Sequence, residues 1–333
     1  MSKTRRATLN LFALAVGTAL VAGGGQASAQ DKPIVLRGVV PYQTQNYLSQ
    51  PLYILKKMVE ERTGGKIKID ILGSEEVVPA LQQFDAVRNG VIDIALGIAS
   101  YYNNTIPEAI GIQYNKDFLP ADLRKNGYHD LMREVHMKKG NVVYLASASG
   151  NPGRAFRLYV KKNLDKPDLS GMKIRVSPVY TSIVKGLNGT PVAMPPADVY
   201  SALERGVVDG LGWTYAGTLD YGFPEVAKYV IDHPFYSINS TIILSKAAWD
   251  KIPQDQRAQL DQIAADFEVA VAKYYEDYCK DEDARLKAKG VSFIKFSPEG
   301  VAKFESAAYD AGWAEFLAKN PTDGEKIKKL LTK

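Results

Sequence analysis

Strand-like and helix-like segments alternate through the first hundred residues of the chain. Runs of apolar and β-branched residues cover residues 34–40, 66–72 and 91–96. Between these runs, apolar residues recur at helical spacing, and the helical stretches end near Gly64 and Gly90. Parallel strands need a crossover connection, usually a helix, so this βαβαβ order predicts a mainly parallel sheet with helices on both faces. We therefore expect an α/β fold.

One helix-to-strand pattern occurs twice. Residues 86–93 resemble residues 202–209, because each segment contains a helix end, a glycine, a β-branched pair and an aspartate. A glycine ends a helix at low cost, since it accepts a left-handed backbone conformation. The repeat is either generic punctuation between a helix and a strand or a sign of two related halves. We expect two similar α/β halves rather than one large sheet.

The longest helical pattern covers residues 253–289. Its apolar residues, from Leu260 to Tyr278, recur at spacings of three and four, and Gly290 suits the C-terminal cap. At a rise of 1.5 Å per residue, such a helix would be roughly 55 Å long. That length exceeds the diameter of a domain of about 150 residues. The helix is therefore expected either to protrude or to lie across both halves, and the second option makes it a mechanical strut.

The first 29 residues have the pattern of a secretory signal peptide. Three basic residues come first, an apolar run follows, and Ala27 to Ala29 supply small residues for cleavage near Gln30. A retained membrane anchor is the alternative, but glycines interrupt the apolar run and no charge cluster follows it. Ordinary secretion fits better than the twin-arginine route. The expected location is the periplasm.

Charge and cysteine content exclude several classes of protein. Removal of residues 1–29 leaves 39 basic against 37 acidic side chains, a net charge of +2 in place of +5. So balanced a charge argues against a nucleic-acid or membrane-surface partner. The one cysteine, Cys279, has no partner for an internal disulfide, and burial on a helix is favoured over a reactive thiol. We expect a soluble monomer whose two lobes depend on their cores for stability.

Enzyme motifs are missing from the sequence. We find no phosphate-binding Gly-Lys-Ser/Thr loop, no nucleophile elbow and no His-Glu-x-x-His zinc motif. The three histidines, His129, His136 and His233, lack metal-ligand spacing. An active site can still assemble from distant residues, so an enzyme is not excluded. We expect no catalytic residues, no metal and no cofactor.

Signals for ligand binding are stronger. A glycine-rich turn over residues 150–153 leads into a segment that carries Arg154 and Arg157, and Arg175 follows in a strand-like stretch. A guanidinium presents a planar fork that matches a carboxylate and keeps its charge in a dry cleft. An equally good alternative is that these arginines form salt bridges with acidic residues on the surface. Aromatic residues that could line either a cleft or a core cluster after Asp209, namely Trp213, Tyr215, Tyr221, Phe235 and Tyr236.

The mature chain resembles the DctP-type substrate-binding proteins of TRAP (tripartite ATP-independent periplasmic) transporters. The resemblance is carried by residues 168–176, 191–194, 198–203 and 206–210, and more loosely by residues 64–69 and 90–95. It implies a two-lobed periplasmic-binding-protein fold with one long helix that bridges both lobes. The implied lobes are residues 30–151 with 239–278 (lobe I) and residues 152–238 with 279–333 (lobe II).

The resemblance also implies roles for individual side chains. Arg175 takes the place of the family arginine that pairs with the ligand carboxylate, and Arg154 that of a second, less constant arginine. Ligand contacts are implied for the loop from Tyr42 to Asn46 and for Ser74-Glu75. Where several relatives carry an asparagine, this chain has Gly212-Trp213-Thr214. This difference argues against a sialic-acid-like ligand and suggests an aromatic wall in the site. The expected ligand-binding residues are Arg175, Arg154, Trp213, Tyr42, Gln45, Glu75 and Tyr236.

The expected function is capture of a small organic acid and its delivery to TRAP membrane permease subunits. An exported enzyme or a ligand sensor on the same scaffold is the alternative. The sequence leaves open whether the ligand is a C4-dicarboxylate, a 2-oxo or hydroxy acid or an aromatic acid. It also leaves open whether a cation assists binding.

Overall fold

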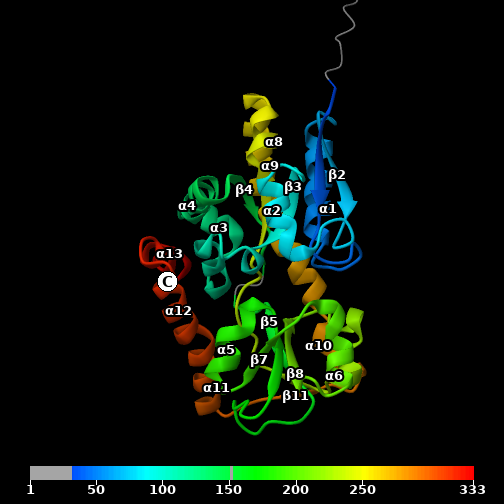
Figure 1. Ribbon diagram of the computed structural model, residues 1–333, viewed down its shortest axis with the longest axis vertical. Coiled ribbons are helices and arrows are strands. Elements are labelled where there is room, and N and C mark those ends of the chain that lie inside the picture. Colours follow the sequence, from blue (N-terminus) through cyan, green and yellow to red (C-terminus); the bar gives the residue numbers. More distant parts are fainter. Residues whose placement is uncertain (1–31, 151–152) are drawn as a thin grey trace, which may run out of the picture. The chain divides into compact units, whose positions relative to one another are not determined.

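The computed structural model describes residues 32–150 and 153–333, which form two β-sheets with helices around each (Figure 1). Residues 1–29, for which we predict a signal peptide, lie outside the described residues. In the part that is described, no helix combines the length and hydrophobicity needed to cross a bilayer.

In the first sheet, four strands run in one direction and one strand, β10, runs in the opposite direction. β1, β2 and β3 run parallel, and the helical crossovers predicted between them are α1 and α2. β10 runs antiparallel to both of its neighbours, β3 and β4. In sheet order the strands are β2 (Ile67–Gly73), β1 (Ile34–Val39), β3 (Ile94–Ile98), β10 (Ser240–Ser245) and β4 (Val142–Ser147).

The second sheet is also mixed. β6 is parallel to β7 and β8, and β11 is parallel to β9, whereas β5 is antiparallel to β8 and β9. In sheet order the strands are β11 (Ser292–Ile294), β9 (Tyr229–Ile231), β5 (Phe156–Val160), β8 (Gly210–Thr214), β6 (Lys173–Val176) and β7 (Thr190–Ala193).

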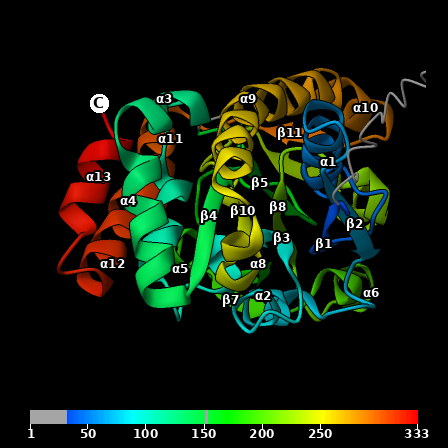
Figure 2. The ribbon, with the colours of Figure 1, turned by 90° about the horizontal axis from the view of Figure 1, so that it is seen from above.

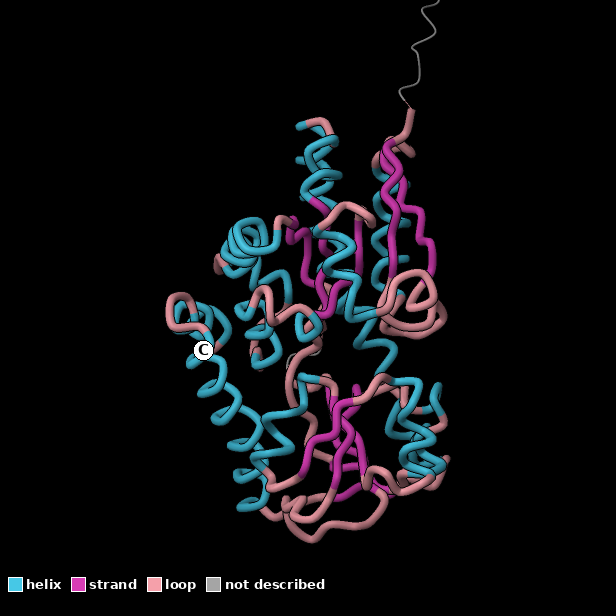
Figure 3. The backbone as a smooth tube through the Cα atoms, viewed as in Figure 1, coloured by secondary structure: helices cyan, strands magenta, loops and turns pink. Residues whose placement is uncertain are grey.

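The prediction of a mainly parallel sheet is therefore confirmed, with one antiparallel strand in each described sheet, β10 in the first and β5 in the second. The antiparallel strands β5 and β10 each follow a segment in which the chain passes from one sheet to the other. Such a strand starts at the edge where β3, β6 and β8 end, and so it runs in the opposite direction. Figure 3 shows the strands of the two sheets as separate groups with these connections between them.

The repeated sequence pattern gives the same local geometry in both sheets. Gly90 and Gly206 follow α2 (Gln83–Arg88) and α6 (Val199–Glu204) with φ of +71° and +73°. Asp93 then accepts the backbone N–H of Arg37 at 2.9 Å, and Asp209 accepts that of Lys173 at 2.8 Å. In each sheet the aspartate thus connects the end of the helix–turn unit to the neighbouring strand. This shared geometry agrees with the expectation of two similar halves.

The long bridging helix is present, but it is divided. Residues 253–289 form α9 (Gln254–Cys279) and α10 (Glu282–Ala288), and Lys280 and Asp281 separate the two helices. α9 packs between α1 (Gln50–Arg62) and α3 (Pro120–Lys125), as Figure 2 shows, whereas Leu286 of α10 is buried in the core of the second sheet. The break allows one segment to bury apolar residues against both halves.

A buried ion pair anchors α9 to the first half. Glu268, on α9, accepts hydrogen bonds from Arg124 Nε at 2.7 Å and from the backbone N–H of Ser147 at 2.9 Å. Burial raises the pKa of Glu268, and the Arg124 guanidinium opposes that shift. Because Arg124 belongs to α3 and Ser147 to β4, this carboxylate ties three elements together.

The C-terminal helices contact both halves. α12 (Ala311–Lys319) packs against α5 (Thr181–Gly186) and against the 3-10 helix Pro107–Tyr114, and α13 (Gly324–Leu331) packs against the same 3-10 helix and α4 (Tyr128–Val135). The last residues of the chain therefore contact elements of both halves. The remaining helices are α7 (Phe223–Val226), α8 (Lys246–Lys251) and α11 (Pro298–Glu305).

Candidate functional site

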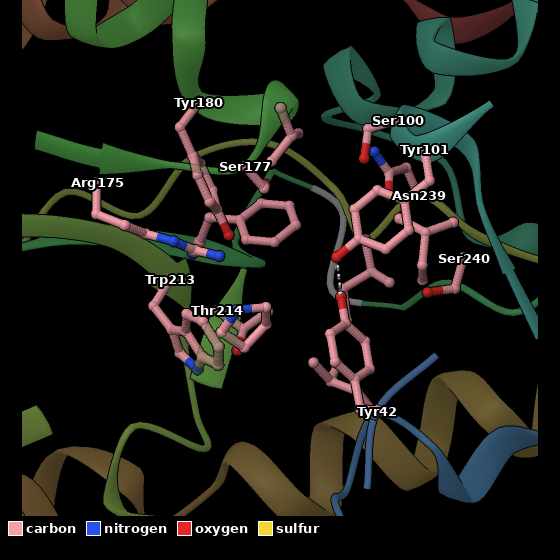
Figure 4. A pocket seen from close by; sticks show the side chains of 16 residues that line it. Tyr42, Ser100, Tyr101, Arg175, Ser177, Tyr180, Trp213, Thr214, Asn239 and Ser240 are labelled. Atoms are coloured by element: carbon pink, nitrogen blue, oxygen red, sulfur yellow. Dashed lines mark hydrogen bonds between the residues drawn. The ribbon is translucent and has the colours of Figure 1, made fainter. Parts of the chain in front are cut away.

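A pocket lies where the carboxyl ends of β3, β6 and β8 meet the segment before β10 (Figure 4). The space between its walls, including the open mouth, is about 490 Å³. Ligands of open α/β sheets bind at the carboxyl ends of strands. We call it the central pocket; its lining is Tyr42, Leu48, Ile98, Ser100, Tyr101, Phe156, Arg175, Ser177, Val179, Tyr180, Pro196, Trp213, Thr214, Ile238, Asn239 and Ser240.

Arg175 is the cation of the central pocket. It lies in β6, is 2% exposed, and is held by backbone oxygens. Its Nε and Nη2 donate to Met194 O at 3.1 and 3.0 Å, and its Nη1 donates to Gly212 O at 3.2 Å. A guanidinium carries five N–H donors, so one N–H on each terminal nitrogen stays available for a ligand.

The charge of Arg175 is not neutralised by the protein. Among the described residues, no Asp or Glu forms a salt bridge with it, although several other arginines are paired with acids. Burial lowers the pKa of Arg175 from its usual value, and the hydroxyls of Tyr180, Tyr101 and Tyr42 oppose that shift. An arginine stays charged at neutral pH even so. A buried cation without a counter-ion is a strong attractor for an anion.

Trp213 forms the wall beside Arg175. It lies two residues after Leu211, the register partner of Arg175, and so projects from the same face of the sheet. The guanidinium carbon lies 5.1 Å from the Trp213 ring, a cation–π contact. Tyr221 and Phe223 pack edge-on against the indole at 5.0 and 4.9 Å between centroids and hold it in place.

Two tyrosines face Arg175 from the first half. Tyr42, after β1, and Tyr101, after β3, approach each other with 3.4 Å between their hydroxyl oxygens (Figure 4). Burial raises the pKa of both phenols, so both stay neutral at physiological pH. The pair can donate or accept a hydrogen bond but carries no charge.

Asn239 is the other polar group on this side. Its backbone oxygen accepts the N–H of Ala99 at 2.9 Å, which fixes the residue directly before β10. The side chain is buried, and within the described residues its Nδ2 finds no hydrogen-bond acceptor. A buried amide N–H without an acceptor is costly, so a ligand oxygen at this point would be stabilising.

The structure brings three of the seven predicted binding residues to the central pocket, namely Arg175, Trp213 and Tyr42. Arg154 is exposed and lines a separate hollow with Arg157 and Asp283. Gln45 is exposed and outside the pocket.

Tyr236 belongs to the core rather than to the pocket. It is 0% exposed, its hydroxyl donates to Ala308 O at 2.8 Å, and its backbone N–H donates to Tyr309 Oη at 2.9 Å. Its φ of +55° is rare for a residue with a side chain. The aromatic cluster after Asp209 is thus divided, with Trp213 in the pocket wall and Tyr236 between the connecting segment and the C-terminal helices.

Glu75 lies in an adjoining hollow that we call the side pocket. This hollow shares Tyr101, Arg175, Ser177 and Pro196 with the central pocket, and its other residues are Glu75, Pro79, Ala80, Leu81, Gln82, Val176, Pro178, Ala193, Met194 and Pro195. Burial, followed by the neighbouring Glu76 carboxylate, raises the pKa of Glu75. Glu75 places a carboxyl group at one edge of the site.

Several lining residues were missed by the sequence analysis. Tyr180 and Ser177 follow β6, Ser100 and Tyr101 follow β3, and Asn239 precedes β10. For the residues after β3 and β6, the position directly after a predicted strand was a usable signal, since ligands bind at such strand ends. Nothing local to Asn239 marks it as special, because its place opposite Arg175 depends on how the chain returns to the first sheet.

Groups for metal binding or nucleophilic chemistry are sparse. Over residues 32–150 and 153–333, no cluster of three or more His, Cys, Asp or Glu residues could hold a metal ion. Cys279 is partly buried at the end of α9, and burial raises its thiol pKa to about 12. A thiol with so high a pKa is a weak nucleophile at neutral pH.

Residues 44–320 match the family model described as bacterial extracellular solute-binding protein, family 7 (DctP). A monocarboxylate 2-oxoacid-binding periplasmic protein of Nostoc sp. is 22% identical over 322 residues, with 92% of this chain and 87% of that protein covered.

Two solved structures are similar in fold. A TRAP periplasmic solute-binding protein from Desulfovibrio salexigens with bound orotic acid has a TM-score of 0.77 at 20% identity, covering 90% of this chain and 97% of its own. A Bordetella pertussis extracytoplasmic solute receptor that binds pyroglutamic acid has a TM-score of 0.77 at 19% identity, covering 90% and 99%. At these identities the likeness shows the two-lobed fold alone.

Proposed function

Because the chain belongs to the DctP family of bacterial extracellular solute-binding proteins, we propose that it captures a small organic carboxylate in the central pocket and delivers it to the membrane subunits of a TRAP transporter. The protein acts in the periplasm, which it reaches through a cleaved signal peptide. It acts as a binder and not as an enzyme, and it works as a monomer.

The observation that carries this proposal is the buried Arg175 guanidinium, which has two N–H groups free and no acidic partner among the described residues. A ligand carboxylate would supply the missing counter-charge. A charge-assisted hydrogen bond contributes about 1.5–3 kcal/mol, and a micromolar complex needs about 8 kcal/mol. Arg175 therefore orients the acid, and the aromatic and polar walls supply most of the remaining affinity.

The two-lobed architecture supports capture by closure. The central pocket is lined from both sheets, and the segments after β4 and after β9, together with α9–α10, connect the halves. Closure around a ligand excludes water and strengthens its pairing with Arg175. The ligand shifts the protein toward the closed form only as far as it binds that form better than the open one.

The ligands of the relatives are consistent with this proposal. Orotic acid and pyroglutamic acid, in the two similar structures, are both carboxylic acids, and the Nostoc protein is named for 2-oxoacids. These acids differ in ring and substituents, so the relatives support the class of ligand and not one compound.

The test is a thermal-shift screen of the purified protein against a library of organic acids, with the corresponding amides as uncharged controls. A ligand in excess raises the melting temperature by mass action, so at least one acid should stabilise the protein while its amide does not. Recovery of that acid unchanged, measured by NMR, separates a binder from an enzyme. If no carboxylic acid stabilises the protein, the proposed function is wrong.

Delivery needs a second experiment. Vesicles that contain the candidate permease subunits should accumulate the acid only when the binding protein is added outside. Binding without any stimulation of uptake would favour a sensor instead.

A further inference from the structure

We propose that the site selects acids with a single carboxylate and one uncharged acceptor oxygen, and that Asn239 donates to that oxygen across the central pocket from Arg175. A ketone, a hydroxyl or an amide carbonyl can supply the acceptor. This inference rests on the proposed function and narrows it to a class of ligand.

The charges around the pocket favour a monoanion. Arg175 is the single charged residue in the lining of the central pocket. The side pocket, which is continuous with it, adds the carboxylate of Glu75 and no further cation among the described residues. A second ligand carboxylate would therefore lose water without gaining a positive partner, and it would lie near a negative one.

The other arginines of this region cannot supply the second positive charge in this arrangement. Arg154 lines the separate hollow beside Cys279 and Asp283. Arg157 is engaged by two carboxylates, since its Nη1 donates to Asp283 Oδ1 at 2.7 Å and its Nη2 to Asp232 Oδ1 at 2.9 Å. A dicarboxylate in the central pocket can therefore pair one carboxylate with Arg175, and its second carboxylate finds no free guanidinium among the described residues.

Asn239 is built as a donor on the opposite wall. It is 3% exposed, and its Nδ2 lacks an acceptor within the described residues, although the Asn239 backbone is held by Ala99. Figure 4 shows Asn239 beside Ser100 and Tyr101, across the pocket from Arg175. Since an amide N–H prefers any acceptor to none, and Arg175 already takes the ligand's carboxylate, a neutral oxygen satisfies the amide without importing a second charge.

Aromatic side chains line the pocket between Arg175 and Asn239. Phe156, Tyr180 and Trp213 are buried and line the pocket. Such walls favour the apolar or planar body of a ligand that is polar at its two ends. The geometry therefore combines one anion site, an aromatic middle and, on the opposite wall, the Asn239 amide as a neutral donor that lacks an acceptor among the described residues.

The test uses three matched sets of acids, measured by isothermal titration calorimetry with the full protein. In each set, one compound has no second oxygen group, one has a neutral acceptor and one has a second carboxylate. The sets are propanoate, pyruvate and malonate; pentanoate, 4-oxopentanoate and glutarate; and benzoate, 3-hydroxybenzoate and isophthalate. In every set that binds, the acid with the neutral acceptor should bind tightest, by about tenfold over the acid with none, and the dicarboxylate weakest.

Asn239→Leu tests the role of the side chain at nearly constant volume. In this variant, the preference for the acid with the neutral acceptor over the acid with none should fall to about twofold or less. Arg154→Ala, in the separate hollow, is the matched control and should keep the native preference. Circular dichroism and a melting curve check that both variants are folded.

The outcomes separate this inference from the proposed function. A dicarboxylate that binds as tightly as its monocarboxylate partner overturns the single-charge rule and leaves the solute-binding function standing. An unchanged preference in Asn239→Leu overturns the role of Asn239. Failure of every acid in all three sets and in the wider screen overturns both proposals.

Discussion

The guanidinium of Arg175 is clamped by the carbonyl oxygen of Met194, which accepts hydrogen bonds from both Nε and Nη2, at 3.1 and 3.0 Å. Met194 follows β7 directly, and β7 pairs with β6 such that Arg175 lies opposite Val192. The end of one strand therefore sets the orientation of the arginine on its neighbour. The side chain is oriented before any ligand arrives, which reduces the entropy lost on binding.

We expect Arg175→Ala to weaken binding of the cognate acid at least about tenfold, because it removes a charge-assisted hydrogen bond. Arg175→Lys should recover only part of the loss, since an ammonium keeps the charge but lacks the planar fork. Calorimetry measures both affinities. Arg154→Ala, outside the central pocket, should bind within about twofold of the native protein, inside the spread expected for a surface change; unchanged affinity in Arg175→Ala would reject the site assignment.

Gly212→Ala should reduce both stability and affinity. A Cβ at this position would lie 2.5 Å from Tyr180 Cγ, so the tyrosine ring must move within the pocket wall. Gly212 also supplies the carbonyl oxygen that accepts from Arg175 Nη1. We expect affinity to fall about tenfold, a value in keeping with overpacking costs of about 1–3 kcal/mol.

The matched control for that change is Gly206→Ala. Gly206 has a φ of +73°, and nothing lies within 4 Å of the added Cβ, so strain is its main effect. Its stability should fall by about 1 kcal/mol, while its affinity should stay native. An equal loss of affinity in the two variants would show that general destabilisation, and not the Tyr180 contact, explains the result.

Arg157→Ala should destabilise the fold rather than abolish the anion site. Arg157 is 2% exposed, pairs with Asp232 and Asp283, and lies 3.9 Å from the Tyr215 ring. Removing one partner of a buried ion pair costs about 3–5 kcal/mol, and the lower end applies here because both carboxylates keep some contact with water.

Urea unfolding curves give the free energy of unfolding of this variant. Arg154→Ala, its exposed neighbour, should stay within about 0.5 kcal/mol of the native protein. A native-like stability of Arg157→Ala would mean that this ion cluster contributes nothing to the connection between β5 and α10.

His136 should make stability depend on pH. The ring is buried, with Nδ1 2.7 Å from Met132 O and Nε2 3.1 Å from Tyr102 Oη, and burial lowers its pKa to about 4. The unfolded chain takes up this proton near pH 6.5, whereas the folded chain resists it down to about pH 4. The contribution of His136 to the free energy of unfolding is therefore fully present above pH 6.5. It is lost as the pH falls toward 4, and the loss is roughly 3 kcal/mol.

The comparison that isolates this group is native protein against His136→Gln, unfolded in urea at several pH values between 7 and 4.5. The difference in the free energy of unfolding between the two proteins should shrink as the pH falls. The variant keeps His129 and His233, whose pKa values burial also lowers, so their contributions cancel in the difference. A difference that does not change with pH would contradict a buried neutral His136.

Local patterns predicted most strands and helices because their periodicity depends on neighbouring residues alone. The predicted run 34–40 is β1, and the glycine caps at Gly90 and Gly206 are real. The run 91–96 shows the limit of this reasoning, since β3 begins only at Ile94. The N–H groups of Val91 and Ile92 bond to Ala86 O and close the helix end, so β-branched residues serve here in a turn.

The sequence by itself determined the α/β class, two similar halves, a long helical segment across them and an arginine at a strand end. Only the tertiary structure decided that the long helix is interrupted at Lys280–Asp281, that Tyr236 lies in the core, and that Asn239 lies opposite Arg175. The physical reason is that spacing along a chain encodes which way a side chain points from its own helix or strand. Which distant side chains then meet depends on how the strands order themselves in two sheets and where the chain crosses between them.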